Sequence, residues 1–131
     1  MPRIASSLPF LLLAACASEA PIQDHTHRIT TTVSITDTAL MPGAVVPIPV
    51  FSTVVWRNRS TRPAEIAVTA ATCGSCETVM GFTPADDGAR SVAIEPGAVA
   101  TLCFHQEGHF NFVAKTGTKA LQGTIVVGPA R

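Results

Sequence analysis

Short runs of alternating or β-branched residues fill the chain from Ile29 onward. Glycine, proline, asparagine and aspartate residues separate these runs at intervals of about ten residues. No capped stretch keeps a 3.6-residue period long enough to predict a helix, although one helical turn is expected at residues 77–80. The expected strands cover residues 29–35, 45–50, 53–58, 64–70, 91–94, 99–105, 110–114 and 123–127. This pattern predicts an all-β sandwich or small barrel.

Alternation within the runs assigns side chains to the core. Leu102 and Phe104 fall on one face of their strand, whereas Thr101, Cys103 and His105 fall on the other. We expect the face with the two large apolar side chains to be the buried one. The same reasoning over the other runs gives the expected core, namely Val54, Trp56, Ile66, Val68, Leu102, Phe104, Phe110, Phe112, Ile125 and Val127.

The first 15 residues have a different pattern, that of a secretion signal. Arg3 precedes an apolar run at residues 8–13, and Ala14 and Ala15 stand directly before Cys16. The apolar run is too short for a membrane-spanning helix, which needs about 20 residues. Leucine, two small residues and cysteine resemble the bacterial lipobox, so we expect cleavage before Cys16 and lipid attachment to it. The alternatives are an ordinary cleaved signal, with this cysteine free or lost, and an A-x-A-like cleavage at Ala15, Ala17 or Ala20.

These features divide the chain into three expected parts. Residues 1–15 are the signal peptide, residues 16–28 are a flexible, lipid-anchored tether of small and polar residues, and residues 29–131 are one folded domain. The whole chain has nine Lys and Arg and nine Asp and Glu, and loss of Arg3 with the signal leaves 8 − 9 = −1. This charge provides no basic field for nucleic acid or an anionic bilayer, so the lipid alone would attach the domain.

The expected location is the bacterial cell envelope, with the domain facing the periplasm. Ala17 and Ser18 follow Cys16, in place of the aspartate that retains lipoproteins at the inner membrane of some enteric bacteria. The outer membrane is therefore favoured. We expect a monomer that is attached to the membrane through its lipid and whose partner is an envelope protein or a small ligand.

Three stretches of the domain resemble the cupredoxins, the Greek-key β-sandwiches of plastocyanin and azurin type that hold blue copper. Residues 39–58 end in TVVWRN, which is similar to the family's V-x-W-x-N motif. Residues 94–104 contain IEPG followed by LCF, and residues 108–127 contain GHFNF and then LQGTIVV, which are similar to the family's last strands. The resemblance implies a cupredoxin-like Greek-key sandwich of seven to eight strands.

The resemblance does not extend to the copper ligands. Blue copper uses two histidines, one cysteine and usually an axial methionine. The family's first histidine follows the Trp-x-Asn strand, where residues 59–65 contain neither His nor Cys. Its cysteine, second histidine and methionine follow the last aromatic strand, where residues 114–121 contain none of these types. We therefore expect the fold without the type-1 copper site.

Three cysteines remain beside the lipidated one, and an oxidising compartment favours pairing. If the cupredoxin topology holds, Cys73, Cys76 and Cys103 converge with His105 and His109 at the end opposite the missing copper site. The simplest expectation is a disulfide from Cys103 to Cys73 or Cys76. This disulfide would fix the long loop of residues 71–90 onto the sheet and stabilise the fold by about 3 kcal/mol in the chain-entropy model.

Two alternatives use the same cysteines differently. A soft-metal site would suit Cu(I) or Zn, although disulfide formation would consume its thiolates. Its candidate ligands are Cys73, Cys76, Cys103, His105, His109 and Met80. Cys73 and Cys76 also have the C-x-x-C spacing of thiol-disulfide exchangers, but the βαβ setting and following helix of that motif are missing.

The sequence therefore favours a non-enzymatic envelope lipoprotein whose domain is a binding or accessory module. The first alternative is a copper-binding electron-transfer or copper-handling protein with a non-standard Cys/His site, and the second is thiol-disulfide exchange at Cys73 and Cys76. No catalytic residue is assigned, and copper is the one candidate cofactor. Arg57, Arg59 and Arg62 cluster after the Trp-x-Asn strand, either as a solvated face or as a surface for an anionic partner.

Overall fold

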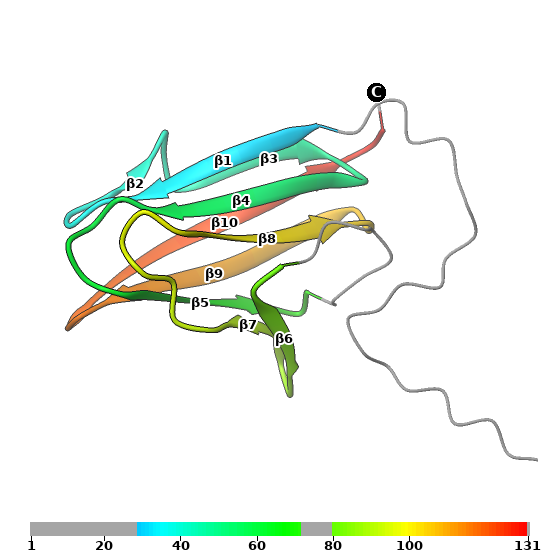
Figure 1. Ribbon diagram of the computed structural model, residues 1–131. Coiled ribbons are helices and arrows are strands. Elements are labelled where there is room, and N and C mark those ends of the chain that lie inside the picture. The colour runs from blue at the N-terminus through cyan, green and yellow to red at the C-terminus, as the bar shows by residue number, and fades with distance from the viewer. Residues whose placement is uncertain (1–28, 72–79, 131) are drawn as a thin grey trace, which may run out of the picture.

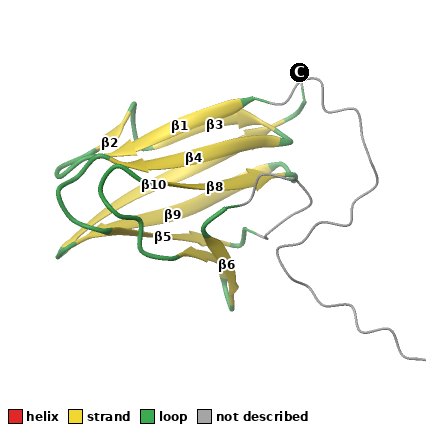
Figure 2. Cartoon of the chain, viewed as in Figure 1, coloured by secondary structure: helices red, strands yellow, loops and turns green. Residues whose placement is uncertain are grey.

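Two packed β-sheets make up the part of the protein that the computed structural model describes, which is residues 29–71 and 80–130 (Figure 1). This part has ten strands and no helix, and Figure 2 shows strands joined only by loops and turns. The all-β sandwich is confirmed, with ten strands where seven to eight were expected. No helix of the described residues is long and apolar enough to cross a membrane.

Four strands form the first sheet, in the order β2-β1-β4-β8. Their bounds are β1 (Thr30–Ile35), β2 (Leu40–Met41), β4 (Ser52–Asn58) and β8 (Val99–Phe104). β1 runs parallel to β4, with Val33 opposite Trp56, and β8 runs antiparallel to β4, with Leu102 opposite Val54. These four side chains lie on one face of the sheet, which is the face packed against the second sheet.

Six strands form the second sheet, in the order β3-β10-β9-β5-β7-β6. Their bounds are β3 (Val45–Pro49), β5 (Ala64–Thr69), β6 (Phe82–Ala85), β7 (Gly88–Ser91), β9 (Gly108–Thr116) and β10 (Lys119–Gly128). Both edge strands contain proline, Pro47 and Pro49 in β3 and Pro84 in β6. Proline has no N–H to donate to a sheet, so it is confined to such edges and makes them poor templates for pairing with another chain.

Aromatic side chains fill the centre of the sandwich. The ring centroid of Trp56 lies 5.4 Å from that of Phe82 and 5.5 Å from that of Phe112, the latter edge to face. All ten side chains expected in the core are buried. The inner-face side chains that the expected core omitted include Val33, Ile35, Val46, Ile48, Phe82 and Ile94.

Three local expectations are corrected. The strand expected at residues 91–94 is displaced, because β7 ends at Ser91 and Ile94 forms only an isolated bridge with Ala64. Met80 forms a bridge with Thr101 and is not helical, while residues 77–79 lie outside the described part. The β6–β7 hairpin was missed because its proline, two aspartates and glycine are turn formers, although here they shape an edge hairpin.

Candidate functional site

Two segments form one end of the sandwich, which we name the arginine pole: residues 59–63 between β4 and β5, and residues 117–118 between β9 and β10. They meet because Ala64 at the start of β5 pairs with Thr116 at the end of β9. These are the segments in which the cupredoxin resemblance places the copper ligands. The second connection is a two-residue turn, since β9 ends at Thr116 and β10 begins at Lys119.

A buried asparagine closes the arginine pole. Asn58 is fully buried, and its Nδ2 donates to the backbone oxygens of Arg62 at 2.7 Å and Ile94 at 2.8 Å. Its Oδ1 accepts from the backbone N–H of Ser60 at 2.9 Å and from the Ser60 hydroxyl at 2.6 Å. Both amide protons and the carbonyl oxygen are therefore used. The side chain binds residues 59–63 to the β7–β8 connection, which fixes this loop in one conformation.

A second tie holds the tip of the same loop. The carboxylate Oδ1 of Asp37 accepts from the backbone N–H of Thr61 at 2.9 Å and from its hydroxyl at 3.0 Å. These two hydrogen bonds, the backbone one first, lower the pKa of Asp37, and the positive charges of Arg62 and Lys119 act in the same direction. The group is solvent-exposed, so the charge effects are screened.

The side chain of Arg62, in the β4–β5 loop, packs on the β9–β10 turn at Gly117. A Cβ built on Gly117 would come within 3.1 Å of Cδ and Nη1 of Arg62. Gly117 also has a φ of 61°, a left-handed conformation that glycine adopts without steric cost. The glycine thus makes the turn possible and leaves room for Arg62 to pack on it.

The donor groups of the arginine pole do not fit type-1 copper. They are backbone amides, hydroxyls, one carboxylate and guanidinium groups, whereas that ion needs two imidazoles and a thiolate. The guanidinium group has no free lone pair and repels a cation. The sequence alone shows that the copper ligands are absent from these segments. It does not show which residues close the pole instead. The N-x-S spacing of Asn58 and Ser60 was the available signal, because an asparagine oxygen that accepts from the second following N–H is an Asx turn.

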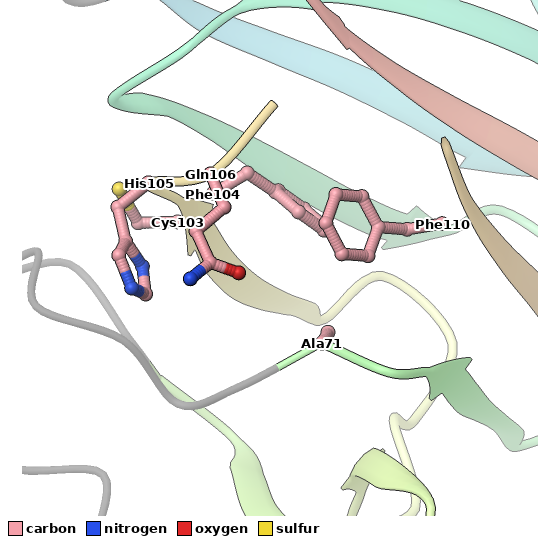
Figure 3. Close-up of a pocket in the computed structure, with 6 residues that line it drawn as sticks. All are labelled: Ala71, Cys103, Phe104, His105, Gln106 and Phe110. Carbon is pink, nitrogen blue, oxygen red and sulfur yellow. The ribbon is translucent and has the colours of Figure 1, made fainter. Parts of the chain in front are cut away.

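The opposite end of the sandwich, which we name the cysteine pole, contains a small cavity. Its lining residues are Ala71, Cys103, Phe104, His105, Gln106 and Phe110. The cavity measures about 10 Å³, enough for one water molecule. Cys103 and His105 line it together (Figure 3), and the rings of Phe104 and Phe110 lie next to each other, tilted by 51° with centroids 5.2 Å apart.

Cys103 is disulfide-bonded, and Cys16, Cys73 and Cys76 all lie outside the described residues. The side chain of Cys103 lies on the outer face of β8, yet it is buried, with an exposed fraction of 1%. Thr101 and Thr53 on the same face are also buried, so β8 is covered on both faces. Alternation had assigned only Leu102 and Phe104 to buried positions; it separates the two faces of a strand but does not show whether the outer face is covered.

The remaining candidate ligands are spread over different elements. His105 follows β8 in the four-stranded sheet, whereas His109 is exposed on the outer face of β9 in the six-stranded sheet. Met80 pairs with Thr101 and is 55% exposed. Within residues 29–71 and 80–130, no group of three or more His, Cys, Asp or Glu side chains could hold a metal ion. The soft-metal hypothesis depends on Cys73 and Cys76, which lie outside the described part.

Comparison with known proteins supports the fold. No protein-family model matches the chain, and no curated protein matches it. Amicyanin from Paracoccus versutus (Thiobacillus versutus) is 15% identical, with a TM-score of 0.54 over 75% of this chain and 80% of that chain. A reduced Cu(I) form of an amicyanin variant at pH 4 is 16% identical, with a TM-score of 0.54 over 81% and 85%.

A further amicyanin variant in its reduced state is 18% identical, with a TM-score of 0.54 over 75% of this chain and 81% of that chain. Amicyanin is a cupredoxin. At these identities the likeness concerns the arrangement of strands, and the ligand positions have to be examined residue by residue. The chain therefore has a cupredoxin-like fold, in which residues 59–65 and 114–121 contain none of the histidine, cysteine or methionine ligands of blue copper.

Proposed function

We propose that this protein is a non-enzymatic cell-envelope lipoprotein whose cupredoxin-like domain is a binding or accessory module. The observation that carries the proposal is the closed arginine pole. Asn58 ties the β4–β5 loop to the β7–β8 connection, and Arg62 packs on the β9–β10 turn. The end of the fold that would hold copper is thus occupied by a hydrogen-bonded loop without soft ligands, which supports a function other than blue-copper electron transfer.

The lipid anchor rests on the sequence. A short apolar run, two alanines and Cys16 are followed by a polar segment at residues 17–28, and the first strand begins at Thr30. A segment of this length separates a lipidated residue from the domain by about 20 Å if it is flexible. The proposal therefore includes a membrane-tethered, periplasm-facing domain, with the outer membrane favoured.

The disulfide at Cys103 is proposed to join it to Cys73 or Cys76. Cys16 would be unavailable because its sulfur carries the lipid. Each of these pairings closes a loop of about 30 residues, for which the chain-entropy model gives about 3 to 4 kcal/mol. The crosslink would stabilise the domain and would leave one thiol.

The second candidate function is copper handling at the cysteine pole. Cys103 and His105 line the same cavity, and thiolate with imidazole suits Cu(I) or Zn. A disulfide-bonded sulfur is not a thiolate, so this function requires the reduced protein. Thiol-disulfide exchange at Cys73 and Cys76 is the remaining, enzymatic alternative.

Metal and thiol analysis of one preparation separates these functions. Residues 22–131, which retain all ten strands, would be purified anaerobically and compared with a Cys103→Ser variant. We expect no stoichiometric copper or zinc, one free thiol and no reduction of insulin. Stoichiometric copper that is lost in the Cys103→Ser variant would overturn the proposal in favour of the copper-handling function. Turnover of insulin disulfides would establish the exchange activity.

The anchor has its own test. Full-length protein with Cys16→Ser should lose incorporation of a labelled fatty acid and leave the membrane fraction, while a Cys76→Ser variant should retain both. Equal labelling of the Cys16→Ser variant and the unmodified chain would contradict lipidation at this residue.

A further inference from the structure

Charge divides unevenly between the two ends of the described sandwich. Five cations lie at or next to the arginine pole, together with three carboxylates, which gives 5 − 3 = +2. The cations are Arg57, Arg59, Arg62, Lys115 and Lys119, and the carboxylates are Asp37, Glu65 and Glu95. All eight side chains are exposed. This end therefore presents a net positive surface on a domain whose described charges sum to zero.

The rest of the described domain carries the balancing charge. Asp86 and Asp87 lie in the β6–β7 turn and Glu107 lies in the β8–β9 turn, both at the cysteine pole, and Arg90 lies on β7 between the ends. Their sum is 1 − 3 = −2. Positive charge therefore gathers at the arginine pole and negative charge toward the cysteine pole, although the described charges sum to zero.

Local pairing reduces some of the positive charge but leaves the centre of the pole. Lys115 stands opposite Glu65 in the β5–β9 register, so this pair offsets itself across the strands. The carboxylate of Asp37 interacts electrostatically with Arg62 and Lys119 and offsets part of their positive charge. Arg59, Arg62 and Lys119 still outnumber this carboxylate at the tip of the arginine pole.

These side chains are displayed on a preorganised backbone. Three contacts hold the loop of residues 59–63. Asn58 donates to the backbone oxygen of Arg62, and Asp37 accepts from the backbone N–H of Thr61. The side chain of Arg62 packs on the turn at Gly117. A surface that is already ordered loses less conformational entropy when a partner binds.

The pole also faces away from the start of the domain. β1 runs from Thr30, opposite Thr53, to Ile35, opposite Asn58, so the chain enters at the cysteine pole and reaches the arginine pole at the far end of β1. Figure 1 shows the beginning of β1 and the end of β10 at one end of the sandwich, and the β4–β5 loop and the β9–β10 turn at the other. A membrane anchor preceding β1 would leave the arginine pole as the distal end.

We propose that the arginine pole is a docking surface for an acidic face of a partner protein. The inference rests on the proposed function as a binding module and adds the place and the chemistry of the contact. Complementary charge raises association rates and selects partners, and arginine is enriched at protein interfaces. The distal position favours a protein over the anchoring membrane. A second copy of this chain is disfavoured because contact with its acidic end would be head-to-tail, which gives a ring or an open filament and not the two-fold dimer that is commonest among oligomers.

A glutamate-rich, fluorescein-labelled peptide serves as the probe for this surface. The mature chain from residue 16, with Cys16→Ser, would be titrated with it and followed by fluorescence anisotropy at about 0.02 M and about 0.15 M salt. We expect salt-sensitive binding that weakens about tenfold in an Arg59→Glu, Lys119→Glu variant. This variant leaves Arg62 and its contact with the turn unchanged, and circular dichroism would verify its fold. Arg90→Glu is the control for a general charge effect and should bind as the parent does.

Each contrary result overturns the inference. Equal weakening by Arg90→Glu would assign the binding to overall charge, and binding to vesicles with one quarter phosphatidylglycerol but not to the peptide would assign the pole to a membrane. Salt-sensitive self-association in sedimentation, lost in the double variant, would assign it to a second copy. Failure of the Cys16→Ser chain to bind the peptide would overturn the docking surface and would leave the proposed function intact, provided that the full-length protein is lipidated and the domain is metal-free. Stoichiometric copper would overturn the proposed function whatever the peptide does.

Discussion

The two poles of the sandwich are closed by different kinds of interaction. At the arginine pole, Asn58, Asp37 and Thr61 form hydrogen bonds that do not depend on redox conditions. At the cysteine pole, Cys103 is covalently bonded through a disulfide on a buried outer face of β8. A cupredoxin-like sandwich has to stabilise the loops at both ends. Here the pole where the family holds copper is held by hydrogen bonds of backbone carbonyls and a buried amide, whereas a disulfide-bonded cysteine lies at the other.

This difference separates stability from metal chemistry. A bound copper ion would tie two loops together through its ligands, and in this chain Asn58 and the Arg62–Gly117 contact provide such a connection without a metal. Neither chelators nor reductants should therefore change the stability of the arginine pole. Stability of the cysteine pole should respond to reductants alone.

The largest effect is expected at the cysteine pole. Cys103→Ala removes the crosslink and should lower the free energy of unfolding by about 3 to 4 kcal/mol. Urea denaturation with and without dithiothreitol would measure it. Reductant should destabilise the parent protein by a similar amount and leave the Cys103→Ala variant unaffected. An equal response of both proteins to reductant would show that this disulfide does not stabilise the pole.

Loss of the buried amide should rank next. Asn58→Ala removes the four hydrogen bonds of the buried amide and leaves the N–H of Ser60 without its partner, whereas the Ile94 oxygen keeps the bond from the Ala64 N–H. The expected cost is about 3 kcal/mol. Asn111→Ala is the matched control, because its exposed side chain accepts from the Thr124 hydroxyl, and it should cost less than about 1 kcal/mol. Urea denaturation under reducing and oxidising conditions should give the same difference between Asn58→Ala and its parent. A difference that vanishes on reduction would couple the two poles.

The turn under Arg62 should contribute less. Gly117→Ala forces a Cβ into a left-handed conformation and against Arg62, and should cost about 1 kcal/mol. Gly43→Ala is the control, since a Cβ there meets nothing within 4 Å and the residue has no positive φ. Thermal unfolding compares the two. Equal midpoints would show that the contact between the loop and the turn is incidental.

The smallest effect is the acid response of the exposed tie. The pKa of Asp37 is lowered in the folded state, so its contribution to stability is present above the unfolded-state pKa and is lost as the pH falls through the folded-state pKa. Asp37→Asn should therefore be slightly less stable than the parent at neutral pH, and the two proteins should converge in strong acid. Denaturant melts across the acid range would check this. A difference that grows on acidification would have the wrong sign for this carboxylate.

Much of the fold follows from side-chain alternation. Trp56, Leu102 and Phe112 were assigned to the core because large apolar side chains recur at every second position of their strands, and that pattern is set by local geometry. The β6–β7 hairpin could not be assigned in this way. Pro84 and the Asp86–Asp87 turn indicate a loop unless a neighbouring strand is available, and only the pairing of β7 with β5 provides one.

The closed pole was only partly predictable. The missing copper ligands can be read from residue types alone. The network of Asn58 cannot, because one of its acceptors is the backbone oxygen of Ile94, which is 36 residues away. In the same way, alternation placed Cys103 opposite the core face, but its burial depends on what covers that face.

Copper titration of the purified domain tests the central claim most directly. Residues 22–131 would be titrated with Cu(II), followed by visible absorption and electron paramagnetic resonance, and with Cu(I), followed by competition with a chromogenic Cu(I) chelator. An Asn58→Ala variant would be titrated beside the parent. The closed arginine pole predicts no intense thiolate-to-copper absorption band in either protein and no stoichiometric binding by the oxidised parent. A blue, one-to-one copper complex of the oxidised parent would contradict the account.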